Sequence, residues 1–152
     1  MQVRSSRVVP RSDGAWLVWQ GTGAFSEAPP PIQAARVDAN GMIVGSVIPV
    51  TNDGDTRGPF AATAIDDRLA VVWPDRIEPG APVLAVSLLD AQGNKLPGTG
   101  ISTAMAPLAP GRLAALGSPW GEKLLVAWSG QTMSGGPLGF QVVRFDCVGL
   151  GP

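Results

Sequence analysis

The chain has 152 residues, of which 45% are hydrophobic and 15% charged, and its formal net charge is −1. This composition is typical of a globular domain with a sizeable core, and it excludes disordered chains and strongly basic nucleic-acid-binding proteins. Because the chain has no histidine, it cannot use a histidine in a catalytic triad, as a general base or as a metal ligand. The lack of a long apolar run excludes a membrane-inserted helix.

The 20 glycines and 15 prolines leave little room for long helices, and the apolar segments read as short strands. Four strands are predicted in the first third of the chain: VRSSRVV (3–9), AWLVW (15–19), IQAARVD (32–38) and MIVGSVIPVT (42–51).

The same order of segments then occurs twice more. The second set is FAATA (60–64), LAVVW (69–73), LAVSLLD (84–90) and NKLPGTGISTA (94–104). The third set is RLAALG (112–117), LLVAW (124–128) and FQVVRFD (140–146), and it stops where a fourth strand is expected.

The repeat has a period of roughly 50 residues, which is typical of propellers and repeat arrays. Its clearest marker is a tryptophan that closes each second strand, at Trp19, Trp73 and Trp128. Because LAVVW and LLVAW are apolar at every position and strand side chains alternate between faces, we expect both faces of these strands to be buried. Blades of a β-propeller meet that condition, since each blade packs between two others.

A resemblance follows from these segments. The small-residue strand, the apolar strand ending in VW, the ARVDANG turn and the final IPVT or GIST strand resemble the β-propeller repeats of large secreted and surface proteins of bacteria, particularly myxobacteria. The resemblance covers nearly the whole chain. It implies an extracellular or cell-surface location and a non-enzymatic role, although the N-terminal residues contain no signal peptide.

The expected fold is therefore all-β, with one repeat domain over residues 1–152 made of three four-stranded, propeller-type blades. The blades cover about residues 3–52, 58–104 and 110–149, and the last lacks its outer strand. A closed propeller needs about four to eight blades. Either the chain is part of a longer protein, or two chains close a six-blade ring. A β-trefoil is an alternative that accounts better for the length, and a β-sandwich is another.

Two sets of residues are assigned structural roles. The strand-ending tryptophans are expected to pack in the core, each donating its indole N–H to a carbonyl. The aspartates of the DANG, DAQG and DCVG turns are expected to cap those turns by accepting backbone N–H groups. This second set is Asp38, Asp90 and Asp146.

The candidate binding residues lie mainly in the loops after the tryptophan strands, since these loops differ between repeats whereas the strands do not. In a propeller all three loops lie on one face, and their mixed side chains suit protein contact better than catalysis. An aromatic residue in the GSPWGE turn is a further candidate for stacking on a sugar or a partner. The set is Phe25, Glu27, Asp75, Arg76, Glu78, Trp120 and Met133.

Other polar clusters are weaker candidates. Asn52, Asp53 and Asp55 place oxygen ligands at a spacing that resembles a Ca²⁺ loop, but the distal Glu of an EF-hand is missing. The adjacent Asp66 and Asp67 lie in a turn and are expected to diverge, unlike the carboxyl pair of a glycosidase. We therefore expect neither a metal site nor a cofactor nor catalytic residues.

Three functions are compatible with these features. The leading one is a binding or structural module that contacts protein, either by self-assembly into a ring or by attachment to a larger surface assembly. A lectin-like module that binds a glycan is the alternative, but the loops lack the equivalent aromatic residues that this function requires. A catalytic propeller is the weakest. Nucleic acid is not an expected partner.

Overall fold

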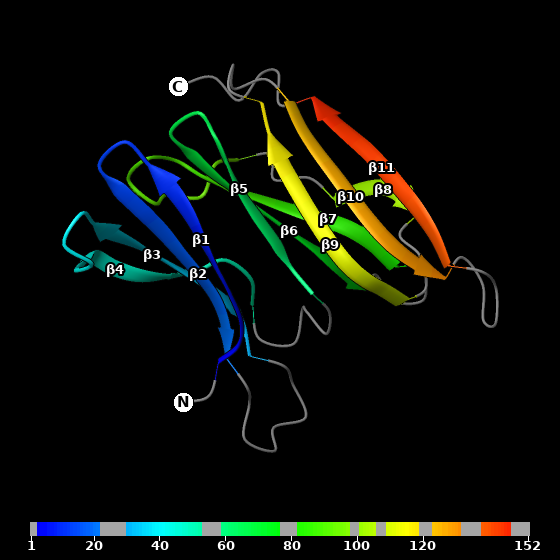
Figure 1. Ribbon diagram of the computed structural model, residues 1–152, viewed down its shortest axis with the longest axis horizontal. Coiled ribbons are helices and arrows are strands. Elements are labelled where there is room, and N and C mark those ends of the chain that lie inside the picture. The colour runs from blue at the N-terminus through cyan, green and yellow to red at the C-terminus, as the bar shows by residue number, and fades with distance from the viewer. Residues whose placement is uncertain are drawn as a thin grey trace.

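The computed structural model describes residues 3–21, 30–52, 59–76, 82–97, 101–105, 109–118, 123–131 and 138–146. Within these stretches every regular element is a β-strand, and no helix is long and apolar enough to cross a membrane. The strands form three antiparallel sheets that lie side by side (Figure 1). The predicted all-β class is therefore confirmed.

Sheet 1 is built from the first repeat. Its strands are β1 (Val3–Arg11), β2 (Gly14–Gly21), β3 (Ile32–Asp38) and β4 (Ile43–Pro49). They pair in chain order, each antiparallel to the next. The sheet is an up-and-down meander, as the sequence predicts for each repeat.

Sheet 2 repeats this order with β5 (Ala61–Ile65), β6 (Arg68–Arg76), β7 (Pro82–Leu89) and β8 (Ile101–Met105). Its last strand is shorter than the predicted segment 94–104. The early part of that segment forms only an isolated bridge to the end of β7. Pro and Gly in the segment explain the short strand, since Pro cannot donate to a ladder.

Sheet 3 contains β9 (Ala109–Gly117), β10 (Lys123–Gln131) and β11 (Leu138–Asp146). The order is again sequential and antiparallel. In the part of the chain that the structure describes, β11 pairs only with β10. Sheet 3 thus has three strands in the stretches that the structure describes.

The first strands of the three sheets are neighbours in space. β1 contacts β5, and β5 contacts β9, so the sheets stack face to face along these strands (Figure 1). The approach between β5 and β9 is very close at Gly117, where a Cβ atom would collide with the carbonyl oxygen of Ala64. The backbone N–H of Gly117 also donates to the Thr63 hydroxyl at 3.2 Å. Small residues on the first strands make this spacing attainable.

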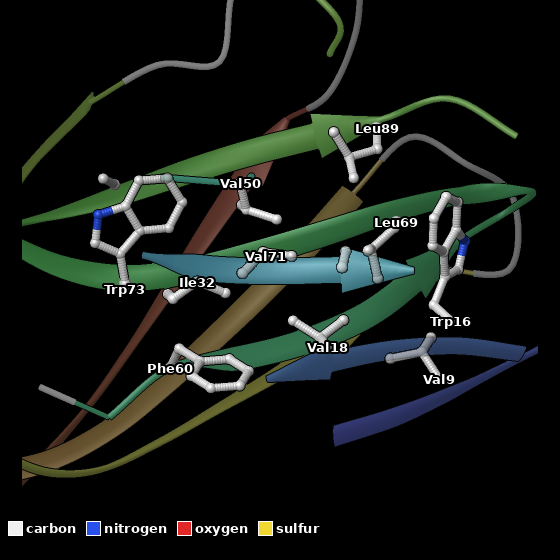
Figure 2. Close-up of a cluster of buried hydrophobic side chains, with 12 residues drawn as sticks. Val9, Trp16, Val18, Ile32, Val50, Phe60, Leu69, Val71, Trp73 and Leu89 are labelled. Carbon is white, nitrogen blue, oxygen red and sulfur yellow. The ribbon is translucent and has the colours of Figure 1, made fainter. Parts of the chain in front are cut away.

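One core fills the space between sheets 1 and 2. Figure 2 shows Trp16 and Trp73 at opposite ends of this cluster, with aliphatic side chains and Phe60 between them. Sheet 1 contributes Val9, Trp16, Val18, Ile32 and Ala34, and sheet 2 contributes Leu69, Val71, Trp73, Ala85 and Leu89; Val50 and Phe60 complete the cluster.

A second core fills the space between sheets 2 and 3. Sheet 2 contributes the side chains of β5, β6 and β7 that point away from sheet 1. Sheet 3 contributes the side chains of the face that is turned toward sheet 2. The buried members are Ala61, Ile65, Ala70, Val72, Leu84, Val86, Leu88, Leu113, Leu124, Val126 and Trp128. Sheet 2 is therefore packed on both faces. The prediction that LAVVW is buried on both sides is confirmed, since all five residues are buried.

The same prediction is wrong for LLVAW in sheet 3. Leu124, Val126 and Trp128 are buried against sheet 2, but Leu125 is 41% exposed. Among the described residues no further sheet covers the face that Leu125 shares with Ala127. Among the described residues the outward face of sheet 1 is also without a covering sheet, and Trp19, which lies on it, is only half-buried. The sequence pattern describes a strand packed on both sides, whereas the end sheets have one neighbour each.

The buried tryptophans also differ from expectation in their polar atoms. Among the described residues, no hydrogen-bond acceptor lies within reach of the buried indole N–H of Trp73 or Trp128. The same holds for Trp16, which the repeat pattern did not include and which is fully buried. Packing of the large ring therefore determines these positions, and not a hydrogen bond to a carbonyl.

The close approach of β5 and β9 is tested by Gly117→Ala. The added methyl group would meet the Ala64 carbonyl. We expect the free energy of unfolding to fall by about 1–3 kcal/mol, the usual cost of overpacking. The control is Ala114→Ser, an exposed position on the same strand, which should change stability by less than about 0.5 kcal/mol. Equal stability of both variants in urea unfolding would contradict the stacking described.

Candidate functional site

The predicted loop residues are mostly beyond what the structure describes. Phe25, Glu27, Glu78, Trp120 and Met133 lie outside the described residues. Asp75 and Arg76 lie at the end of β6, where they pair with Val83 and Pro82 of β7, and the Asp75 side chain is half-buried. Of this set the structure therefore describes two neighbouring residues, Asp75 and Arg76.

The acidic candidates lie in two separate segments, and two of them are outside the described residues. Asn52 is exposed, and its partners Asp53 and Asp55 lie outside the described residues. Asp66 and Asp67 are exposed in the two-residue turn between β5 and β6, where Asp66 has a φ of 58°. Among the described residues, no group of three or more Asp, Glu or Cys is arranged to hold a metal ion.

The DANG and DAQG turns adopt the same structure. Asp38 Oδ1 accepts from the backbone N–H of Asn40 at 2.9 Å and of Met42 at 2.8 Å. Asp90 Oδ1 accepts from the backbone N–H of Gln92 at 2.9 Å and of Asn94 at 2.8 Å. The third turn begins at Asp146, which ends β11, and its side chain is outside what the structure describes.

These hydrogen bonds favour the ionised carboxylates. The backbone N–H of Met42 is the main cause that lowers the pKa of Asp38 below its usual range. Partial desolvation raises the pKa of Asp90, but the side chain and backbone N–H of Asn94, followed by backbone N–H groups of the turn, outweigh it and lower the pKa. Both turns are therefore stabilised by charge at neutral pH.

The two turns differ in what surrounds them. The Asp90 turn lies against sheet 1, where the Ala91 carbonyl accepts from Arg11 Nη1 at 3.0 Å and from Arg36 Nη1 at 3.3 Å. Gly93 in this turn lies so close to Ile48 that a Cβ atom would collide with it. The absence of a side chain at Gly93 thus permits the turn of one sheet to contact the end of the preceding sheet.

Arg11 is the centre of this contact. Its side chain is 9% exposed, lies 5.1 Å from the centroid of the Trp16 ring, and forms an ion pair with Asp13 at 3.0 Å. Asp13 is largely exposed, so the ion pair itself adds little. Stacking on Trp16 holds the guanidinium in position to donate to the Ala91 carbonyl. We call Arg11, Arg36 and Trp16 the turn clamp.

The Asp38 turn, in contrast, is exposed. Ala39, Asn40 and Gly41 are all exposed, and a Cβ atom built on Gly41 would meet no atom within 4 Å. The strands near this turn also expose large apolar residues, which are Met42, Ile43, Val44 and Val47.

The outer faces of the end sheets are the second unusual surface. On sheet 1, Val8 is 69% exposed and lies beside the half-buried Leu17. On sheet 3, Leu116 is 65% and Val142 56% exposed, on either side of Leu125. Monomeric proteins rarely expose apolar residues in such contiguous groups. These two faces, named the sheet 1 outer face and the sheet 3 outer face, are the candidate functional surfaces.

Sequence reasoning missed both the turn clamp and the outer faces. A signal for the clamp was available, because Trp16 occupies the position of Ala70 and Leu125 when the tryptophan strands are aligned. The exposed faces follow from the number of repeats, since only the middle of three stacked sheets has two neighbours. Comparisons add no further assignment: no protein-family model matches the chain, and no curated protein matches it.

The turn clamp is tested by Arg11→Met, which keeps the length of the side chain but removes the charged donor. The Ala91 carbonyl loses one of its two donors, and we expect the free energy of unfolding to fall by about 1–3 kcal/mol. Arg112→Met is the control, because Arg112 is exposed on sheet 3. If chemical denaturation gave both variants the same stability as the unmodified protein, the clamp would be energetically irrelevant.

The Asp90 turn predicts a pH dependence. A carboxylate whose pKa is lower in the folded state contributes stability above its unfolded pKa, near 3.8, and loses it as the pH falls through the folded value. In Asp90→Asn this contribution is missing. We expect the stability difference between the two proteins to be largest above about pH 5 and to shrink below pH 3.8. Urea unfolding from pH 2 to 7 measures it, and a constant difference would argue against the charged cap.

Proposed function

We propose that this protein is a non-enzymatic binding or structural module whose three sheets act as propeller-type blades and whose outer faces engage protein. The observation that carries the proposal is the exposure of apolar side chains on these faces. In the middle sheet the residues aligned with Leu17, Trp19 and Leu125 are Val71, Trp73 and Ala70, and all three are buried against a neighbouring sheet. Each outer face therefore has the composition of a packing surface.

The strand pairing supports the propeller-type arrangement over the β-trefoil. All strand pairs among the described residues connect strands of the same repeat, and the repeats contact each other through faces and through β1, β5 and β9. A trefoil instead pairs strands of different repeats in one barrel. A radial stack of separate meanders is how propeller blades are arranged.

The protein partner we favour is a second copy of the chain, so that self-assembly forms part of the function, with attachment to a larger surface assembly as a further role. The sheet 3 outer face combines apolar side chains, such as Leu116 and Leu125, with the exposed cations Lys123 and Arg144, and this mixture suits protein contact. An extracellular or cell-surface location belongs to the proposal and depends on the resemblance to bacterial propeller repeats.

Concentration-dependent stability tests this proposal. If the outer faces bind other copies, the midpoint of thermal unfolding should rise with protein concentration, because association stabilises the folded state by mass action. Leu125→Glu places a charge in the sheet 3 outer face and should remove that dependence. Lys95→Glu, an exposed position of sheet 2 that lies on neither outer face, should retain it.

Two results would contradict the proposal. A midpoint independent of concentration in the unmodified protein would exclude self-association through these faces. An equal concentration dependence in Leu125→Glu and Lys95→Glu would show that association uses another surface. Binding to a glycan array without self-association would instead favour the lectin-like alternative.

A further inference from the structure

The two outer faces are not equivalent, and the repeat itself shows how they differ. In β2 and β6 the residues Trp16, Val18, Ala70 and Val72 all face the following sheet. The strand alignment places Leu125 and Ala127 of β10 at the same positions. The sheet 3 outer face is therefore the surface with which a blade contacts the next blade.

The sheet 1 outer face is instead the surface with which a blade contacts the preceding blade. Leu69, Val71 and Trp73 of β6 pack on the preceding sheet, as do Leu124, Val126 and Trp128 of β10. The equivalent residues of β2 are Ala15, Leu17 and Trp19, which lie on the sheet 1 outer face. The chain thus exposes one surface of each kind, and both types of contact already occur between its own sheets.

The turns show the same complementarity. The Asp90 turn of sheet 2 is held by Arg11 and Arg36 of the preceding sheet. The Asp38 turn has the same internal hydrogen bonds but is exposed. In the Asp38 turn, the Ala39 carbonyl occupies the position that the Ala91 carbonyl occupies in the Asp90 turn.

An arginine occupies the matching position on sheet 3. Arg36 lies opposite Trp16 in the β2–β3 register, and Arg144 lies opposite Leu125 in the β10–β11 register. Because Trp16 and Leu125 are equivalent, Arg144 stands where Arg36 stands in sheet 1. Arg144 is also exposed on the sheet 3 outer face.

From this geometry we infer that two copies of the chain associate head to tail: the sheet 3 outer face of one copy packs on the sheet 1 outer face of the other. In this contact Arg144 of one copy donates to the Ala39 carbonyl of the other, as Arg36 does to Ala91 within the chain. The inference rests on the proposed function and specifies its partner. Head-to-tail contacts close into rings when the rotation permits.

Complementation between two blocked variants tests the direction of the contact. One variant, Val8→Glu with Trp19→Gln, blocks the sheet 1 outer face. The other, Leu116→Glu with Leu125→Glu, blocks the sheet 3 outer face. Sedimentation velocity is recorded for each variant alone and for an equimolar mixture, and circular dichroism checks that each is folded. If the first double variant is unfolded, Val8→Glu alone replaces it, because Val8 is the most exposed of these side chains.

Head-to-tail contact requires one intact face of each kind. We expect each variant alone to be monomeric and the mixture to form a 1:1 complex, because each variant retains the face that the other lacks. Association of either variant alone would show that identical faces pair. A mixture that stays monomeric, although the unmodified protein associates, would overturn the head-to-tail contact and leave the proposed function intact. A monomeric unmodified protein would overturn both.

Arg144→Met tests the clamp separately. We expect it to weaken self-association of the unmodified protein by roughly tenfold, the usual loss for a charged donor, without changing the far-UV circular dichroism spectrum. Lys95→Met, an exposed position that follows the Asp90 turn of sheet 2, is the control and should leave association unchanged. An unchanged dissociation constant for Arg144→Met would exclude the contact with Ala39.

Discussion

Face-to-face packing of sheets is the interaction on which the rest of this structure depends. A four-stranded meander buries little by itself, and a sheet gains most of its stability when its apolar faces leave water. Sheet 2 does this on both faces, through the alternating side chains of Leu69, Ala70, Val71, Val72 and Trp73. The small residues of the first strands, with Gly117 as the limiting case, permit the sheets to come this close.

The same dependence accounts for the surfaces of the end sheets. Sheets 1 and 3 repeat the sequence pattern of sheet 2, which packs on both sides, but each has one neighbouring sheet among the described residues. Their outer faces therefore retain apolar residues without a covering layer. Apolar packing alone would not fix the relative position of sheets 1 and 2. The hydrogen bonds to the Asp90 turn fix it, because they form at one position only. The turn clamp fixes which end of one sheet meets which end of the next.

Much of this fold could be predicted from the sequence, because tryptophan strands and DAxG turns repeat at a constant spacing. IQAARVD gave the bounds of β3 correctly, since its apolar alternation ends at a turn aspartate. NKLPGTGISTA did not give those of β8, since Pro and Gly interrupt the ladder. The candidate site was harder to predict from the sequence. Trp16 illustrates the reason. It stands at the position that Ala70 occupies in the next repeat, and the contact between its ring and Arg11 depends on the three-dimensional packing.

The molar mass of the unmodified chain in solution, measured by light scattering over a range of concentrations, tests the central claim most directly. That claim is that the outer faces are blade-packing surfaces which cover one another between copies. It predicts a closed particle of twice the chain mass of 15.6 kDa, formed by six blades and constant over the upper part of the range. A mass of 15.6 kDa at every concentration would contradict the claim. A mass that rises without limit would show contact between copies without ring closure.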